Sequence, residues 1–335
     1  MNLIIFTIKR LFHLLIALII ISAVTFVITR VLPGNPAYLI VGVQADYEIL
    51  QSVIQKLGLD KPIYEQYKIY VFDFLQGNFG NSWRTGNTVI EDIIIRWPAT
   101  FELSTLSIII AVLWSIPLGI MSSLKNNSFS NYIAKVLSSL GISIPEFWLG
   151  TILLLIFFVN LGIAPAPMGR ISFVDAPETI TGLYLADSLI TGNFEAFKMS
   201  LYQLYLPACT LAFVIGSPLL RVTKKCTEEV LDSQYIKFAK SLGVGNYTIL
   251  FRHVLPNIIL PVSTMVGILY GYLLGGTILV EYVYAWPGIG KYAIDSINSS
   301  DYSPVMAIVM LSAISYLIVY LIMDIFHFFI DPRSR

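Results

Sequence analysis

Six long apolar runs constrain this chain more than any other feature of its sequence. Each has about the 20 mostly apolar residues that an α-helix needs to cross the hydrocarbon core of a bilayer. The runs are Leu11–Thr29, Leu103–Leu124, Val136–Leu161, Met199–Leu220, Asn257–Val280 and Tyr302–Met323. Strand-like alternation is weak in them, so the sequence predicts an all-α membrane protein with six transmembrane helices rather than a β-barrel.

The composition agrees with a membrane protein, because the 335 residues are 56% hydrophobic and only 13% charged. A soluble domain of this length could not bury so much apolar surface. The first run is longer than the core of a secretory signal, and no small-x-small cleavage site follows it, so we expect it to stay as an anchor. The spacing of Cys209 and Cys226 suits neither a metal site nor a disulfide.

Six spans place both chain ends on one side of the membrane, and the distribution of lysine and arginine indicates which side. We expect the base-rich side to be cytoplasmic. Its bases are Lys9, Arg10, Lys125, Lys135, Arg221, Lys224, Lys225, Lys237, Lys240, Arg252, Arg333 and Arg335. Acids gather on the opposite, outer side. Membrane insertion explains this polarity, so we expect no nucleic-acid partner.

Two outer connections are long enough to have a function. Pro33–Ala99 contains two amphipathic helix candidates, Tyr47–Leu57 and Ile63–Leu75, joined at Gly58–Pro62. Glycine there ends one helix and proline begins the next, which predicts a small helical subdomain outside the membrane. The second connection, Gly162–Ser200, is long enough to cover the mouth of a pathway.

The cytoplasmic connection Thr223–Pro256 predicts two short helices hinged at Gly243–Asn246, where glycine permits positive φ. It is too short to be an enzyme domain. The chain therefore divides into a first transmembrane helix (1–32), an extracytoplasmic subdomain (33–99) and a five-helix transmembrane core (100–335) that carries the cytoplasmic loop 223–256.

The sequence predicts no catalytic residue, metal site or cofactor of its own. The glycine-rich segment Pro287–Lys291 lacks the spacing of a phosphate-binding P-loop and is better interpreted as a turn. His13, His253 and His327 are scattered, with no spacing that would place two metal ligands on one helix face.

The most informative spacing lies in the cytoplasmic loop. Tyr235-Ile-Lys-Phe-Ala-Lys-Ser-Leu-Gly243 is followed by nine residues and then by His253-Val-Leu-Pro256. This pattern resembles the signature loop of ABC importer permeases, in which E-A-A, three residues, G, nine residues and I-x-L-P follow in that order. Ala239, Gly243, Leu255 and Pro256 fall on motif positions, whereas Lys237, Phe238 and His253 depart from it.

The physical interpretation of this loop is a short coupling helix, Ser233–Leu242. Tyr235, Phe238 and Leu242 lie along one of its faces, and Gly243 closes it, so the helix could seat in a groove of a partner. The alternative is an amphipathic loop that lies on the bilayer surface.

Matches along most of the chain resemble the oligopeptide, dipeptide and nickel subfamily of these permeases. They are Pro33–Ala37, Leu57–Pro62 with Gln66-Tyr67, Gly77–Gly80, Pro98–Leu103, Pro145–Gly150, Leu206–Ala208, Glu281–Gly290 and Asp331–Arg333. Only Ile171–Met199 fits poorly, because this connection is usually shorter in the family.

The resemblance implies a type I importer in a bacterial or archaeal cell membrane, with both termini of this multi-pass chain in the cytoplasm. A second related permease, two cytoplasmic ATPases that use ATP and Mg, and an extracytoplasmic binding protein that delivers peptide would be its partners. Nickel or metal-chelate uptake is the leading alternative cargo. A secondary transporter and a structural subunit of another membrane complex are the alternatives from other classes.

Glu146 follows Pro145 about midway along the third run, where a charge is costly and tends to face a cavity or a partner. One hypothesis is that it lines a translocation path and attracts a cationic group; the other is that it bonds to a neighbouring helix. Gly141 and Pro145 favour a bend in this helix, although packing alone also explains both.

Two further positions mark the outer surface and the inner end of the bundle. Glu281 and Trp286 lie where the fifth run reaches the outer surface, and they either shape an outer gate or mark the interface, with the tryptophan anchored among the headgroups. Asp324, near the inner end of the last run, is expected to pair with a base at a helix end or with a backbone group.

Overall fold

The computed structural model describes residues 3–31, 46–56, 58–124 and 129–330. Within these ranges the regular structure is helical apart from one isolated bridge between Asn81 and Thr88, which confirms the predicted all-α class. The sequence matches at 33–37 and 331–333 lie outside the described residues.

Five helices are long and apolar enough to cross a membrane, and a bent pair makes a sixth span if it is counted as one. The five are α1 (Leu3–Val31), α5 (Val89–Leu124), α9 (Phe194–Leu231), α12 (Leu255–Gly276) and α15 (Tyr302–Ile330). Because α5 runs through residue 99, the boundary predicted there falls inside a helix rather than in a loop.

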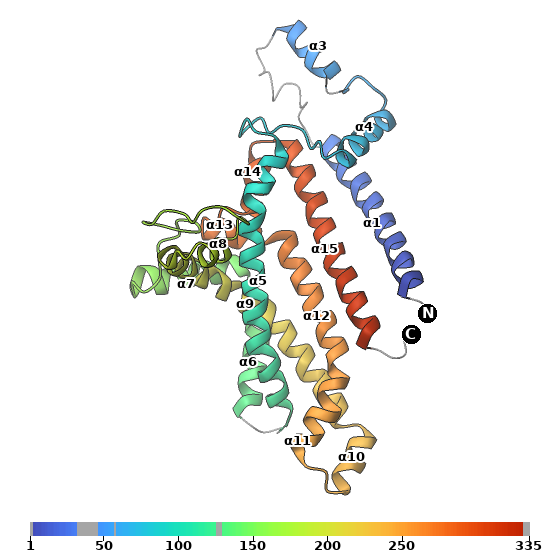
Figure 1. Ribbon diagram of the computed structural model, residues 1–335, viewed down its shortest axis with the longest axis vertical. Helices are drawn as coiled ribbons and strands as arrows, with labels where there is room; N and C mark the ends of the chain where they lie inside the picture. The colour runs from blue at the N-terminus through green and yellow to red at the C-terminus, as the bar shows by residue number, and fades with distance from the viewer. Residues whose placement is uncertain (1–2, 32–45, 57, 125–128, 331–335) are drawn as a thin grey trace.

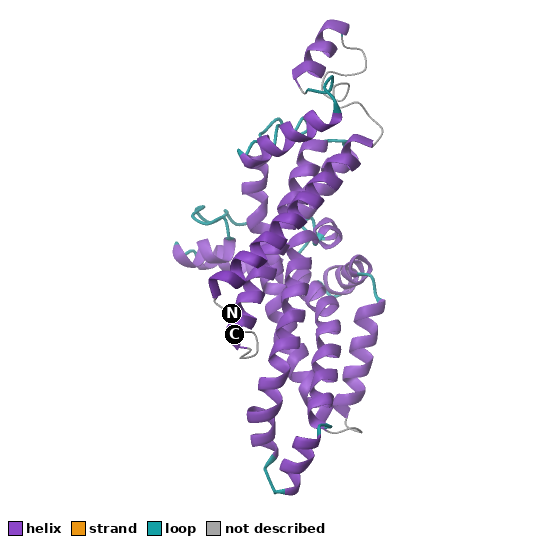
Figure 2. Cartoon of the chain, turned by 90° about the vertical axis from the view of Figure 1, so that its right-hand side faces the viewer, coloured by secondary structure: helices purple, strands orange, loops and turns teal. Residues whose placement is uncertain are grey.

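The bundle is elongated, and its two ends carry different short helices (Figure 1). One end, the α4 end, carries α3 (Tyr47–Lys56) and α4 (Ile63–Leu75), close to the predicted ranges. The other, the α10 end, carries α10 (Gln234–Ser241) and α11 (Asn246–Thr248). Figure 2 shows the same elongated arrangement from the side, so α3 and α4 lie far from α10.

Helices α5 and α9 form the central pair of the bundle, and glycine brings them close together. A Cβ on Gly119 would lie 2.9 Å from the Thr223 side chain, and a Cβ on Gly216 would overlap the Trp114 ring. Trp114 also donates from Nε1 to the Ala212 carbonyl at 3.3 Å. Close approach of this kind suits helices that associate in lipid, where burial of apolar surface drives little association.

The predicted loop Thr223–Pro256 begins inside α9 rather than at the end of a helix. Helix α9 continues to Leu231, beyond its apolar run. Two i,i+4 ion pairs stabilise this extension: Lys224 with Glu228 and Lys225 with Glu229, each at 3.8 Å. The apolar run therefore located α9 but not the end of the helix.

The third apolar run is not one helix. Helix α6 (Phe129–Ser143) ends before Pro145, and α7 (Glu146–Leu153) continues into the π-helical turn η1 (Leu154–Asn160), bent by 107° from α6. Pro145 is the N-cap of α7 and has no N–H to continue α6. The predicted bend is confirmed, and Glu146 begins a new helix midway along the bent pair rather than lying inside one continuous helix.

The fifth run is also broken, so its predicted end at Val280 is wrong. Helix α12 ends at Gly276, and the short α13 (Ile278–Val283) and α14 (Ile289–Asn298) follow it. At its other end α12 continues directly from α11 through the π-helical turn η2 (Ile249–Val254). The second short helix expected in the cytoplasmic loop is therefore the beginning of the fifth long helix.

Helix α1 lies at the edge of the bundle, beside α15 (Figure 1). Arg10 Nε pairs with Asp324 Oδ2 at 3.1 Å, with Asp324 mostly buried, so the predicted pairing of Asp324 with a base near a helix end is confirmed. Aromatic contacts of Phe26 with Tyr67 and Tyr70 attach α4 to the other end of α1.

Candidate functional site

Helix α10 is anchored at a single buried side chain. Ile236 is fully buried and packs in the same core cluster as Ile249 and Val254 of η2. After α10, Gly243 adopts a φ of +80°, and the Val244 N–H donates to the Ala239 carbonyl at 3.1 Å. This is the glycine-terminated helix end that the sequence pattern predicts. The predicted segment Ser233–Leu242 includes the helix and both caps.

Around this anchor lies an exposed apolar surface, which we call the α10 face. Its exposed side chains are Tyr235, Phe238, Leu242, Tyr247 and Phe251. Phe238 is 65% exposed and Leu242 is 68% exposed, which is unusual for large apolar side chains outside the apolar spans. Lys237 is also exposed, whereas Ala239 is half-buried against the rest of the loop.

A second contact joins α10 to the beginning of α12. Asn257 Nδ2 donates to Tyr235 Oη at 3.2 Å and to the His253 carbonyl at 2.6 Å, and the Tyr235 ring meets the His253 ring edge to face. Leu255 packs against the core, and Pro256 lies at the junction of η2 and α12. The structure therefore ties α10 to η2 and to the beginning of α12, where Leu255 and Pro256 lie.

Glu146 lies at the bend between α6 and α7, near the Tyr272 hydroxyl of α12. Its side chain is half-buried, and Tyr272 is half exposed. Within the described ranges Glu146 has no hydrogen bond and no ion pair. Gly141, one turn earlier, packs so closely on Ser217 of α9 that a Cβ would overlap its hydroxyl, so packing explains this glycine.

Glu281 is fully buried and joins α13, α14 and α5. Its Oε1 accepts hydrogen bonds from the hydroxyls of Thr100 at 2.6 Å and Thr277 at 2.7 Å, and its Oε2 accepts from the Lys291 N–H at 3.0 Å. The carboxylate thus sits at the N-terminus of α14, where free N–H groups and the helix dipole favour an anion. Burial raises the pKa of Glu281, although these hydrogen bonds oppose the increase.

The glycines of the Pro287–Lys291 segment are explained by this carboxylate. A Cβ on Gly288 would overlap both Glu281 oxygens, and a Cβ on Gly290 would lie 2.7 Å from the Ile278 backbone. Only Pro287 and Gly288 lie outside a helix, because Ile289–Lys291 already form the first turn of α14, so the prediction of a turn over the whole segment is wrong. The segment brings backbone N–H groups to a carboxylate. Beside it Trp286 is buried and donates from Nε1 to the Ala99 carbonyl at 2.9 Å. The expectation that Trp286 lies among lipid headgroups is therefore wrong.

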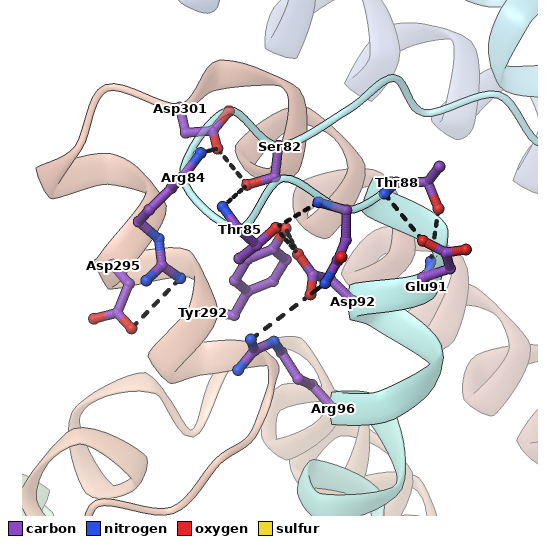
Figure 3. Close-up of polar contacts among 11 residues, drawn as sticks. Ser82, Arg84, Thr85, Thr88, Glu91, Asp92, Arg96, Tyr292, Asp295 and Asp301 are labelled. Carbon is purple, nitrogen blue, oxygen red and sulfur yellow. Dashed lines mark hydrogen bonds and ion pairs between the residues drawn. The ribbon is translucent and has the colours of Figure 1, made fainter.

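A polar network at the α4 end fastens the loop before α5 to α5, α14 and the start of α15 (Figure 3). Asp92 accepts hydrogen bonds from Thr85 Oγ1 at 2.6 Å and Tyr292 Oη at 2.8 Å, and Arg96 stacks on the Tyr292 ring. Asp301 accepts a bond from Ser82 Oγ at 2.6 Å. These contacts join residues 82–96 to residues 292–301, two segments that are distant in sequence.

The second outer connection is held by buried charges. Arg170 pairs with Glu102 of α5 at 2.8 Å and lies over the Tyr184 ring, with both charged groups buried. Asp187 of α8 (Tyr184–Ile190) accepts three backbone N–H groups and the Thr181 hydroxyl. Burial alone would raise the pKa of Asp187, but these hydrogen bonds outweigh it and lower the pKa.

Sequence reasoning missed Ile236, the Arg170–Glu102 pair and the Asp92 network. Glu102 offered a signal, because an ionisable group at the start of an apolar span needs a partner. Ile236 offered a weaker signal: it is an apolar residue on a different side of the helix from Tyr235, Phe238 and Leu242. Nothing in the sequence pairs Asp92 with Tyr292, because that contact depends on how α5 and α14 cross.

Comparisons with known proteins identify the family. Residues 115–335 match the family model described as binding-protein-dependent transport system inner membrane component, and residues 3–104 match the N-terminal model of the same systems. The probable D,D-dipeptide transport system permease protein DdpB of Escherichia coli is 37% identical, with 97% of this chain and 96% of that protein covered. The dipeptide transport system permease protein DppB of Alkalihalophilus pseudofirmus is 36% identical (98% and 99%), and the glutathione transport system permease protein GsiC of Salmonella choleraesuis is 34% identical (98% of each).

Proposed function

Because the chain belongs to the binding-protein-dependent transport system inner membrane component family, we propose that it is the membrane permease through which an ABC importer takes up short peptides. The relatives' names support peptide as the cargo: they name dipeptide, D,D-dipeptide and glutathione transport. No observation favours the nickel or metal-chelate alternative over peptide. The expected membrane is that of a bacterial or archaeal cell, with both chain ends in the cytoplasm.

The observation that carries the proposal is the α10 face. A helix of eight residues is fixed to the bundle by Ile236, yet Phe238 and Leu242 remain exposed beside it. We assign this face to a cytoplasmic ATPase, because an amphipathic helix is recognised by laying its apolar side in a groove. The proposed complex has a second permease, two ATPases that bind ATP and Mg, and an extracytoplasmic binding protein. This chain itself performs no catalysis and binds no cofactor.

The contacts of α10 suggest how motion passes into the membrane. Ile236 ties α10 to η2, and the hydrogen bond from Asn257 to Tyr235 ties it to α12. When ATP closes the ATPases, a displaced α10 would move α12 with it, because η2 and α12 are continuous. Such rigid-body rearrangement opens a path alternately to the two sides. On this account Glu281 and its turn fix the outer end of the same unit and help shape an outer gate.

The test is uptake by the reconstituted complex in sealed vesicles. The proposal predicts that a labelled dipeptide accumulates only when ATP is on the α10 side and loaded binding protein is on the α4 side. Accumulation driven by an ion gradient without ATP would instead indicate a secondary transporter. A complex that hydrolyses no ATP and moves no solute would indicate a structural subunit.

Glu146 is proposed to contact the cationic amino terminus of the passing peptide. Its free carboxylate lies at the break between α6 and α7, where an unpaired charge is tolerated only beside water or a polar group. We predict that Glu146→Gln lowers the uptake rate of a dipeptide about tenfold, and that of its N-acetylated form much less. Tyr272→Phe, which keeps the charge, is the control for packing at this position. Equal uptake rates of wild type and Glu146→Gln for every peptide would show that Glu146 does not contact the passing peptide.

A further inference from the structure

A groove of about 510 Å³, lined by both polar and apolar side chains, runs between α6 and α9 toward the α10 end. It begins next to the bend that carries Glu146 and continues along α6 as far as Ala134. Its lining residues are Ala134, Lys135, Ser138, Ser139, Ile142, Ser143, Leu220, Arg221, Lys224, Lys225 and Glu228.

The groove carries an excess of positive charge, because it is lined by four bases and one acid. Lys224 is already occupied: its Nζ donates to Asn131 Oδ1 at 2.6 Å and lies 3.8 Å from Glu228. Lys225 lies at the exposed rim and pairs with Glu229. No carboxylate of the described residues lies within ion-pair distance of Lys135 or Arg221, and both side chains are exposed. Two cations therefore remain available for an anionic ligand.

Hydroxyl groups continue the groove from these cations toward the bend. Ser138, Ser139 and Ser143 line it, and of these the exposed Ser139 and Ser143 make no hydrogen bond with the described part of the chain. Both α6 and α9 belong to candidate spans. Polar groups at membrane depth are stable where they face water or protein rather than acyl chains. Membrane proteins generally carry an excess of lysine and arginine on the cytoplasmic side, which explains the cations of the groove but not its serines.

From these features we propose that the groove binds the C-terminal carboxylate of the peptide as it leaves the path. The inference rests on the proposed function. A carboxylate accepts hydrogen bonds from a guanidinium, an ammonium and hydroxyls together, which is the set of donors that Arg221, Lys135 and the serines present. A phospholipid headgroup is also anionic, but its acyl chains need a continuous apolar surface above the bases, and here Ser139 and Ser143 interrupt the apolar Ile142 and Leu220.

The test compares a dipeptide with its C-terminal amide in the reconstituted complex. The measured quantity is the ratio of the uptake rate of the free dipeptide to that of its amide. The binding protein prefers one of the two peptides to the same extent in every experiment, so a change in this ratio between wild type and variant comes from the permease. We expect the carboxylate-to-amide ratio to fall about five- to tenfold in the Lys135→Gln, Arg221→Gln double variant. Arg221→Lys should keep most of the ratio, and Lys198→Gln, which removes an exposed charge near the other end of α9, should not change it.

Three results would overturn the inference. An unchanged ratio, or an equal loss for both peptides, would show that the bases do not bind the carboxylate. An effect that appears only in vesicles containing phosphatidylglycerol, equally for both peptides, would assign the groove to lipid. If the wild-type complex took up neither peptide, the proposed function itself would fail, and the carboxylate site with it.

Discussion

At the scale of the residue, the side chains with the most specific surroundings are buried carboxylates. Glu281 has donors from two hydroxyls and the backbone of α14, and two glycines give it room. The sequence placed Glu281 near the outer surface, but its partners could not be predicted, because Thr100 is 181 positions away. Glu146 could be recognised as unusual from the sequence alone, since a charge inside an apolar run is visible without a structure.

Removal of the Glu281 carboxylate should leave several buried donors without an acceptor. We predict that Glu281→Ala lowers the free energy of unfolding by about 3 kcal/mol or more, and that Glu281→Gln, which keeps one acceptor oxygen, lowers it less. Denaturant unfolding of the purified complex measures both values. Glu178→Ala is the matched control, because that side chain is exposed. If Glu281→Ala were as mild as Glu178→Ala, Glu281 would not be holding α13, α14 and α5 together.

At the scale of the element, apolar periodicity located the helices, and proline and glycine located several breaks. The bend at Pro145 and the turn at Gly243 are found where those residues predicted them. The extension of α9 to Leu231 was missed, because charged i,i+4 pairs continue a helix after its apolar run ends. The break of α12 at Gly276 was also missed, since the residues on both sides of it are equally apolar.

Two glycines near α10 allow the effect of a positive φ to be tested separately from the effect of replacing a glycine. Gly243 has a φ of +80°, whereas Gly245 has a φ of −65°, and neither has a heavy atom within 4 Å of a Cβ position. We predict that Gly243→Ala destabilises the end of α10 by about 1 kcal/mol, because an L-residue is strained at positive φ. Amide hydrogen exchange at Val244 should then accelerate about fivefold, and ATP-driven uptake should fall. Gly245→Ala should change neither, and equal effects of the two substitutions would contradict this account.

At the scale of the whole molecule, the short helices α3 and α4 and the α10 loop lie at opposite ends of one bundle (Figure 1). The resemblance of the sequence to importer permeases gave the family, and the structure added how α10 is fixed to the helices that it would move. Ile236 is the essential part of that addition, because a helix without a buried anchor could not transmit a displacement. What the sequence could not give is the crossing of α5, α9 and α14, which depends on contacts between distant residues.

The central claim is that the α10 face contacts an ATPase, and cross-linking tests it most directly. In a chain whose two cysteines, Cys209 and Cys226, are replaced by serine, Phe238→Cys supplies one exposed thiol on α10. Leu189→Cys on α8, which is similarly exposed, supplies the control. The account predicts that a short thiol cross-linker joins Phe238→Cys, but not Leu189→Cys, to an ATP-hydrolysing subunit of the native complex. No ATPase cross-linked at Phe238→Cys, or equal cross-linking at both positions, would contradict it.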